Sequence, residues 1–592
     1  MRFFSTLIAS FLGTLFGLGL LFVFGLLFVF ALASTSEQPP AIRTGSIIVA
    51  ELSGTYPEMV SGDPVAQAFG GEPSVDLHDL TRAFRMAAAD DRIDGVWLRF
   101  GDLQTSWASL EAIRRGIEAV RDSGKTVIAS SDLYYMGEDE LYLASAADSI
   151  HLDPESLFEF NGFALQVAFY DRLFEKVGIN AQAVRAGRFK SAVEPYTQEA
   201  MSAENRAQLQ ALADGIEGTF VEAIAASRGL SPDAVRALAR QGSVLTARQA
   251  ADAGLIDRLA YRDQVSEAFG DDPRTVSLSQ YARSSPSAAG IRSGSEGEIA
   301  VVHAIGAILP GDTDGPFGTG ELGVSAKRFQ EAMSRAREDD DVDAVVVRID
   351  SPGGYAAAAD AMLREINRTL EVKPVLVSMG SMAASGGYWI AAPADTIVAE
   401  SLTITGSIGV FGLLMDVSTL VEEHVGITFD EVKTAPSADM MSGLRPLTAS
   451  EENALEAMID QTYERFLELV AEGRGMSVAD VDAVAQGRVW TGRDALGAGL
   501  VDVLGGLDTA VELAADRAGL AAGTYRVSEL PRPRTFVERL TESMEARVVA
   551  RTPSVSDLLP RPLASAVAAL RVFGQMPSGA VHARIPFVIE YR

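Results

Sequence analysis

Two glycine-rich motifs in the second half of the chain hold the side chains best suited to chemistry. SPGG (351–354) directly follows the apolar run VVVRID, and ASGGYW (384–389) follows VLVSMG. Short apolar runs rich in branched side chains are typical of strands buried in a parallel sheet. Open α/β sheets place their sites beyond the carboxyl ends of such strands. Ser385, at the start of a helix with free N–H groups, is therefore a candidate nucleophile with its own oxyanion stabiliser, or it only N-caps that helix.

A serine nucleophile needs a base, and lysine is the best candidate in this sequence. The five histidines lie far apart and none falls in an obvious loop near these motifs, and GxSxG is absent around Ser385. A buried lysine can lose its proton near neutral pH. Of the six lysines, Lys190 in the run GRFKSAVEP lies in a loop bordered by Gly, Phe and Pro. The alternative is that Lys190 is an ordinary surface lysine.

The sequence contains two copies of one domain. Five segments recur in the same order at an offset of 245 to 252 residues; DDRIDGVWLRF (90–100), for example, recurs as DDDVDAVVVRI (339–349). A register held through five motifs indicates a tandem duplication. Each copy alternates apolar strands with amphipathic helices, which predicts α/β domains built from βαβ units.

The domain boundaries follow from the repeat and from composition. We expect the first domain at 44–276 and the second at 298–515, joined by a Ser/Gly-rich linker at 277–297. The C-terminal extension, 516–592, lies outside the repeat, and the sequence assigns it no role.

The two copies differ at the positions that carry the candidate chemistry. Where the second copy has Ser385 the first has Glu138, and where the second has SPGG the first has DLQT (102–105). Conversely, Lys190 of the first copy aligns with Met441 of the second. Loss of the serine and glycines on a retained scaffold favours a dedicated site in the second copy. The copies must therefore pack together, within one chain or between chains, to join serine and lysine.

Composition excludes several classes of protein. The 592 residues carry a formal net charge of -30, whereas a nucleic-acid-binding protein needs a basic surface to displace counterions. Without cysteine there is no disulfide, thiolate zinc site, iron–sulfur cluster or cysteine nucleophile. The histidines show neither HExxH nor HxH spacing, which argues against a histidine metal site and leaves a carboxylate site open.

The N-terminus has the composition of a membrane anchor. No charged residue lies between Arg2 and Glu37, and the stretch 7–33 is almost wholly apolar. About 20 apolar residues cross a bilayer core of ~30 Å, so we expect one transmembrane helix within residues 1–36. The alternative is a signal peptide cleaved after the run ALA (31–33), although such apolar regions span only ~7–15 residues. Charge bias predicts a cytoplasmic N-terminus, with the domains on the periplasmic side of a bacterial cytoplasmic membrane.

Together with TGSIG (405–409), these motifs resemble the signal peptide peptidase A (protease IV) family in its long bacterial form with tandem domains. The resemblance covers roughly residues 45–515 and the anchor. It implies two domains of the ClpP/crotonase type and a membrane-associated homotetramer that cleaves signal peptides left in the membrane. Ser385 matches the nucleophile, Lys190 the general base, and Ser407 the hydroxyl that holds the lysine. The backbone N–H groups of Gly354 and Gly386 match the oxyanion hole.

The resemblance implies acyl transfer from a peptide substrate, a reaction that needs no metal or organic cofactor. Two other functions stay open. A crotonase-like acyl-CoA enzyme would also use backbone N–H groups as an oxyanion hole, but CoA esters are cytoplasmic and the anchor places the domains outside. A non-catalytic membrane scaffold would use the tandem domains for assembly only, which leaves the joint presence of Ser385, Lys190, SPGG and TGSIG unexplained.

Deletion of residues 1–36 tests the anchor. Because no catalytic candidate lies in this segment, the shortened protein should be soluble and should still hydrolyse a peptide substrate. Cell fractionation of both forms, followed by a peptidase assay of each fraction, measures this. A shortened protein found entirely in the membrane fraction would contradict the assignment.

Overall fold

The structure, a computed structural model, describes residues 13–14, 16–17, 19–20, 42–59, 75–131, 134–241, 243–291, 294–311, 323–530 and 581–584. The transmembrane helix expected within residues 1–36 lies almost entirely outside these ranges. Among the residues that are described, no helix combines the length and the apolar character needed to cross a membrane.

Strands and helices alternate along both copies, as the sequence pattern predicts. The elements of the first copy and the segment after it are β1 (Ser46–Gly54), α3 (Leu77–Ala89), β2 (Ile93–Leu103), α4 (Trp107–Asp122), β3 (Thr126–Ser131), β4 (Tyr135–Met136), α5 (Glu138–Ala144), β5 (Ser149–Leu152), β6 (Leu157–Phe160), α6 (Asp171–Val177), β7 (Asn180–Ala186), η1 (Ser191–Val193), α7 (Glu194–Thr197), α8 (Ala203–Arg228), α9 (Pro232–Arg240), β8 (Ser243–Thr246), α10 (Ala247–Asp252), β9 (Arg258–Leu259), α11 (Arg262–Glu267), β10 (Arg274–Ser277), α12 (Leu278–Tyr281) and η2 (Pro286–Ala289). Those of the second copy and the tail are β11 (Gly297–Ile305), β12 (Ala307–Leu309), β13 (Gly323–Ser325), α13 (Ala326–Glu338), β14 (Val342–Ser351), β15 (Gly353–Tyr355), α14 (Ala356–Leu370), β16 (Val375–Ala384), α15 (Gly386–Ala391), β17 (Thr396–Ala399), β18 (Ile404–Gly406), β19 (Val410–Asp416), η3 (Leu420–Val425), α16 (Ala449–Arg474), α17 (Val478–Val484), β20 (Val489–Thr491), α18 (Gly492–Gly497), β21 (Val503–Leu504), α19 (Leu507–Arg517), β22 (Tyr525–Leu530) and β23 (Val581–Arg584).

Each copy is built on a mainly parallel sheet. The first has the strand order β10-β1-β2-β3-β5-β9 with every pair parallel. The second has the order β20-β18-β16-β14-β11-β22, and β17 also pairs with β16. Among the described strands in this order, β18 and β20 pair antiparallel and the other neighbours pair parallel. In the second copy α13 and α14 pack on one face of the sheet and α19 on the other, so its central strands read as continuous apolar runs such as Val345–Val347, which is fully buried. The fold class predicted from the sequence, mixed α/β with parallel sheets, is confirmed.

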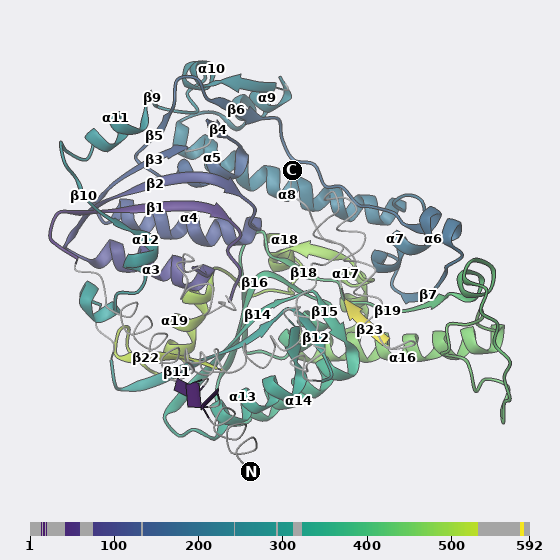
Figure 1. The fold of residues 1–592 in the computed structure, drawn as a ribbon. Coiled ribbons are helices and arrows are strands. Elements are labelled where there is room, and N and C mark those ends of the chain that lie inside the picture. The colour runs from purple at the N-terminus through teal and green to yellow at the C-terminus, as the bar shows by residue number, and fades with distance from the viewer. Residues whose placement is uncertain are drawn as a thin grey trace, which may run out of the picture.

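A third sheet joins the two copies. Its order is β13-β12-β15-β23-β19-β7, in which β7 belongs to the first copy and β19 to the second. These two strands pair antiparallel over seven residues, from Val410 opposite Ala186 to Asp416 opposite Asn180, and they lie side by side in Figure 1. Because β7 leads directly into the loop of Lys190, this pairing carries a first-copy residue to the edge of the second copy.

The duplication is also visible in the long helices. α8 and α16 each have 26 residues, and each is followed by a short helix. Both begin at a hydroxyl N-cap, Ser202 or Thr448, whose side chain accepts a bond from the amide three residues on. Both end at a left-handed glycine, Gly229 or Gly475, the usual stop for a helix.

The segment 277–297, expected as a linker, is folded in its described part. Leu278 and Tyr281 of α12 are buried in the core of the first copy, and the Tyr281 hydroxyl donates to Asp90 Oδ2 at 3.0 Å. Its serines serve as helix N-caps: Ser277 and Ser285 each accept a bond from a backbone amide three residues on. A Ser/Gly-rich composition therefore reflects capping here as well as turns. Of the C-terminal extension beyond residue 530, the structure describes only 581–584.

A buried ion pair fastens the first copy to the second sheet. Glu58, in the loop after β1, accepts bonds from Arg348 of β14, with Nη2 to Oε1 at 2.5 Å and Nε to Oε2 at 3.0 Å. Both side chains are about 5% exposed or less. Arg348 also donates to Ser378 Oγ and to the Met379 carbonyl. Burial and then the charge of Glu58 raise the pKa of Asp350 to about 7.

Breaking this pair should destabilise the protein far more than breaking an exposed one. Glu58→Ala leaves Arg348 buried without a counter-charge, so the free energy of unfolding should fall by ~3–5 kcal/mol. The control is Glu222→Ala, which removes an exposed ion pair with Arg493 that also joins the two copies. This substitution should change the free energy of unfolding by only ~0–1 kcal/mol. Urea denaturation followed by tryptophan fluorescence measures both. Equal losses in the two variants would contradict this account.

Candidate active site

Ser385 occupies a strained turn between β16 and α15. Its backbone has φ +55° and ψ −113°, which is uncommon for a residue other than glycine. The turn is fixed on both sides, because the Ser385 N–H donates to Gly406 O at 2.8 Å and its carbonyl accepts from Trp389 N at 2.8 Å. Although Ser385 holds the N-cap position, its hydroxyl makes no capping hydrogen bond. The alternative of a simple N-cap therefore does not fit the structure.

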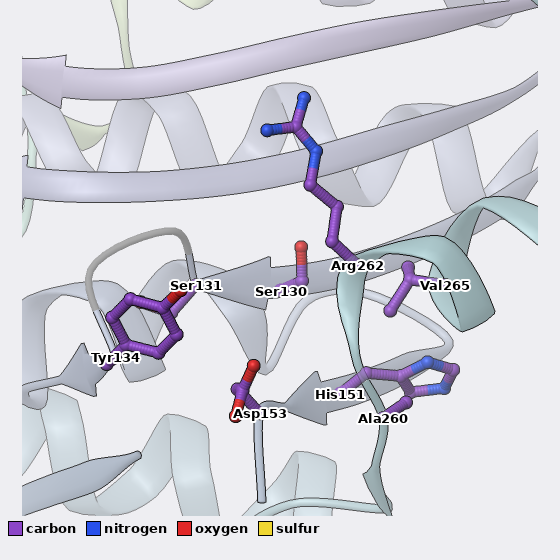
Figure 2. Close-up of a pocket in the computed structure, with 8 residues that line it drawn as sticks. All are labelled: Ser130, Ser131, Tyr134, His151, Asp153, Ala260, Arg262 and Val265. Carbon is purple, nitrogen blue, oxygen red and sulfur yellow. The ribbon is translucent and has the colours of Figure 1, made fainter. Parts of the chain in front are cut away.

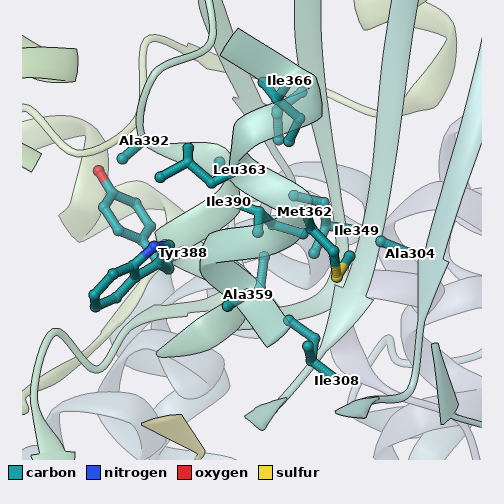
Figure 3. Packing of buried hydrophobic residues seen from close by; sticks show 14 of the residues in the cluster. Ala304, Ile308, Ile349, Ala359, Met362, Leu363, Ile366, Tyr388, Ile390 and Ala392 are labelled. Atoms are coloured by element: carbon teal, nitrogen blue, oxygen red, sulfur yellow. The ribbon is translucent and has the colours of Figure 1, made fainter. Parts of the chain in front are cut away.

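The helix that follows Ser385 is locked into the core of the second copy. Tyr388 and Ile390 of α15 are fully buried, and the Tyr388 hydroxyl donates to Leu500 O at 2.8 Å. Figure 3 shows Ile390 among Met362 of α14 and Ile349 of β14. This packing holds the turn rigid, so the hydroxyl of Ser385 keeps one place.

Lys190 is buried beside Ser385, within one chain. It is 1% exposed, and its Nζ lies within hydrogen-bonding distance of three oxygen atoms: Ser385 Oγ at 2.7 Å, Ser407 Oγ at 3.0 Å and Ser407 O at 3.0 Å. The alternative of a surface lysine does not fit. Burial lowers the pKa of Lys190 well below its ordinary value, because desolvation disfavours the ammonium. A neutral amine keeps a lone pair that can take a proton from a hydroxyl 2.7 Å away.

Ser407 is the second partner of Lys190. It lies after β18, is 1% exposed and has φ +51°, another uncommon backbone angle. Its N–H donates to Arg488 O at 2.7 Å, which fixes the turn that presents both its carbonyl and its hydroxyl to the amine. The sequence motif TGSIG thus forms one wall around Lys190 Nζ.

Two glycines to which the sequence analysis assigned no role let the two copies meet at this point. A Cβ added at Gly487 would lie 2.6 Å from the backbone nitrogen of Lys190, and one at Gly187 would lie 2.5 Å from the backbone of Gln486. Both glycines also have positive φ, +76° and +101°. Only glycine allows two backbones to approach this closely. Their sole signal in the sequence is their place in turns next to RFK and RVW.

Buried polar side chains, also missed, support the loop that carries Lys190. Glu194 is fully buried and accepts bonds from Ser202 Oγ at 2.6 Å, Asn205 Nδ2 at 3.0 Å and Arg185 Nη1 at 3.2 Å. Gln208 bonds to both copies, donating to Ser191 Oγ at 2.8 Å while accepting from the second copy's backbone. Such residues fall in helices, where a charged or amide side chain carries no signal of burial.

The candidate oxyanion donors lie in the elements that flank Ser385. Gly386 is the first residue of α15, whose first-turn N–H groups have no acceptor within the helix. Gly354 is in β15, and a Cβ there would lie 2.1 Å from the carbonyl oxygen of Ile308. The SPGG turn is shaped by Ser351, whose Oγ accepts from Gly353 N at 3.1 Å. The serines and glycines of both motifs are buried.

The first copy uses its equivalent positions for structure. Glu138, which aligns with Ser385, accepts bonds from the backbone N–H groups of Asn161 at 2.7 Å and Gly162 at 2.9 Å. A pocket of about 320 Å³ opens over the first-copy sheet, between β3, β5 and α11, and holds none of the predicted site residues (Figure 2). In the part of the chain that the structure describes, no group of three His, Asp or Glu residues is placed to hold a metal ion.

Comparison with known proteins gives the family. The model of peptidase family S49 matches twice, over residues 119–272 and 367–521, and both matches begin near the end of the corresponding helices α4 and α14. The chain is a member of peptidase family S49. It is 32% identical over 528 residues to serine protease SPPA, chloroplastic, of Arabidopsis thaliana, covering 88% of this chain and 76% of that protein. It is 34% identical over 518 residues to Protease 4 of Salmonella typhi, covering 84% and 81%.

The S49 protein is thus a serine protease of the tandem-domain SppA type. The resemblance drawn from SPGG, ASGGYW, TGSIG and GRFKSAVEP is confirmed, and so is the duplication, because the family domain is present twice.

The lowered pKa of Lys190 should appear in the pH dependence of stability. The unfolded chain holds the lysine proton up to its ordinary pKa of 10.5, whereas the folded protein releases it at lower pH. Between these two pKa values the unfolded state binds the extra proton, so the free energy of unfolding rises with pH by up to ~1.4 kcal/mol per unit. Lys190→Met lacks this dependence.

The wild type should therefore gain stability relative to Lys190→Met as the pH rises within that window. Urea denaturation of both proteins from about pH 6 to 9 measures the difference, with Lys176→Met, at an exposed lysine, as the control. A constant difference between wild type and Lys190→Met would show that Lys190 has an ordinary pKa in the folded protein.

Proposed function

We propose that the protein is a membrane-anchored endopeptidase with a catalytic dyad of Ser385 and Lys190. The observation that carries the proposal is the 2.7 Å hydrogen bond between Lys190 Nζ and Ser385 Oγ in a buried site. Burial favours the neutral amine, which is the form that acts as a base. Ser407 positions that amine through its hydroxyl and carbonyl.

The reaction would proceed by acyl transfer. Lys190 takes the proton of Ser385 as Oγ attacks the substrate carbonyl, and the N–H groups of Gly354 and Gly386 stabilise the oxyanion. Lys190 then gives the proton to the leaving amine. Water attacks the acyl-enzyme with Lys190 again as the base, and the serine is released. Every proton transfer in this scheme uses the same amine, and no metal or organic cofactor enters it.

For the substrate and setting, we propose signal peptides at the bacterial cytoplasmic membrane. Support comes from the apolar, uncharged N-terminal stretch and from the resemblance to signal peptide peptidase A. Residues 1–36 would anchor the chain by one span, with two domains of the ClpP/crotonase type on the periplasmic side and a homotetrameric assembly. Neither the acyl-CoA enzyme nor the scaffold has an observation in its favour.

Replacement of the nucleophile tests the dyad. Ser385→Ala should abolish casein hydrolysis, because removing the nucleophile of a serine protease lowers kcat by about 10⁶-fold. A serine-reactive phosphonate should label the wild type at Ser385, identified by mass spectrometry. The control is Ser334→Ala in α13, where the hydroxyl bonds to Glu338 of its own helix. Wild-type turnover by a correctly folded Ser385→Ala protein would refute the assignment.

A further inference from the structure

The C-terminal tail places one short strand next to the SPGG motif. β23 runs antiparallel to β15, with Ala583 opposite Gly354. Its other edge runs antiparallel to β19, with Val581 opposite Gly412. Figure 1 shows β23 in yellow close to both strands, although it lies about 50 residues beyond β22 in the sequence. Neither copy of the repeat includes this segment.

The edge of β15 that β23 occupies is the edge a substrate needs. A peptide carbonyl attacked by Ser385 must lie beside the N–H of Gly354, and an extended peptide reaches such a place by adding a strand to an exposed edge. The other edge of β15 is already taken by β12, where Ile308 lies opposite Gly354. A Cβ at Gly354 would fall 2.1 Å from the Ile308 carbonyl oxygen, so no peptide fits between these strands.

On the side of β15 away from β12, the space between β15 and β19 is one strand wide, and we call this space the slot. The sheet order is β12-β15-β23-β19-β7, so β19 bounds the slot on its far side. β19 is itself fixed, because β7 pairs with it over seven residues and leads to Lys190. A substrate strand beside β15 would therefore take the place that β23 fills, and both cannot bind at once.

We propose that β23 is an internal competitor, which fills the peptide-binding slot between β15 and β19 and has to leave before a substrate enters. The proposal rests on the proposed function of the Ser385 site. A tethered segment has an effective concentration on the order of mM. If the free segment binds with a Kd of about 0.1 mM, the apparent KM rises roughly tenfold. The kcat stays unchanged, because a substrate that has entered meets the same dyad.

Two truncations separate the strand from the rest of the tail. The chain ending at residue 580 lacks β23, whereas the chain ending at residue 584 keeps it and loses only residues 585–592. The first should show a KM for a peptide substrate about tenfold below that of the full chain, with the same kcat. The second should behave as the full chain does.

Adding the strand back in trans tests competition directly. A synthetic peptide with the sequence of residues 578–587 should raise the KM of the chain ending at 580 and leave its kcat unchanged. The same peptide with proline in place of Ala583 should have no effect, because proline lacks the N–H that a strand pair uses. Equal KM values for the two truncations would overturn the proposal. So would a lower kcat for the chain ending at 580 that the peptide restores, since β23 would then be a structural strand.

A binding measurement separates this proposal from the proposed function. In the Ser385→Ala background, fluorescence anisotropy of a labelled peptide substrate should give a Kd about tenfold lower for the chain ending at 580 than for the chain ending at 584. That difference would support the competitor even if no form of the protein hydrolysed peptides. Equal Kd values would overturn it even if the wild type proved a fully active peptidase.

Discussion

The hydrogen bond between Lys190 and Ser385 joins residues 195 positions apart, and much of the structure serves to keep it buried. A lysine side chain taken out of water must lose its proton or pair with a carboxylate. Here the hydrogen-bond partners of Lys190 Nζ are oxygen atoms of Ser385 and Ser407, and none of these partners is a carboxylate. The pairing of β7 with β19 brings the loop of Lys190 to the second copy, and the backbone of Lys190 packs directly against Gly487. Removal of any of these contacts would admit water and favour the ammonium.

One scaffold therefore serves two purposes in this chain. The second copy holds the serine at the carboxyl ends of its strands, whereas the first copy fills the same position with Glu138 bonded to backbone amides. Arg99 and Arg348 occupy equivalent places on β2 and β14, yet Arg348 is paired with Glu58 from the other copy and Arg99 with Glu51 of its own. After duplication, each copy kept the fold while its polar residues took different partners.

The sequence was sufficient for features that depend on local pattern. The repeat, the parallel strands and the serine at a strand–helix turn all have a signal within a few neighbouring residues, and Lys190 stood out because it complements Ser385 across the copies. The third sheet could not be predicted in this way, because β7, β19 and β23 are remote in sequence and pair by backbone bonds that few side chains reveal. Gly187 and Gly487 were missed for a similar reason, since their need for glycine arises only when two distant backbones meet. The Ser/Gly-rich composition of 277–297 predicted a linker and gave no sign that Ser277 and Ser285 would cap short helices, as they do in the structure.

The covalent link between the copies has a consequence for how the site responds to dilution. If the serine and the lysine came from separate polypeptides, the fraction of complete sites would fall as the protein became scarce, as in any association equilibrium. Fusion fixes their stoichiometry at one to one and makes their encounter intramolecular, with a high effective concentration. A cell that holds only a few copies of the chain would still have every site assembled.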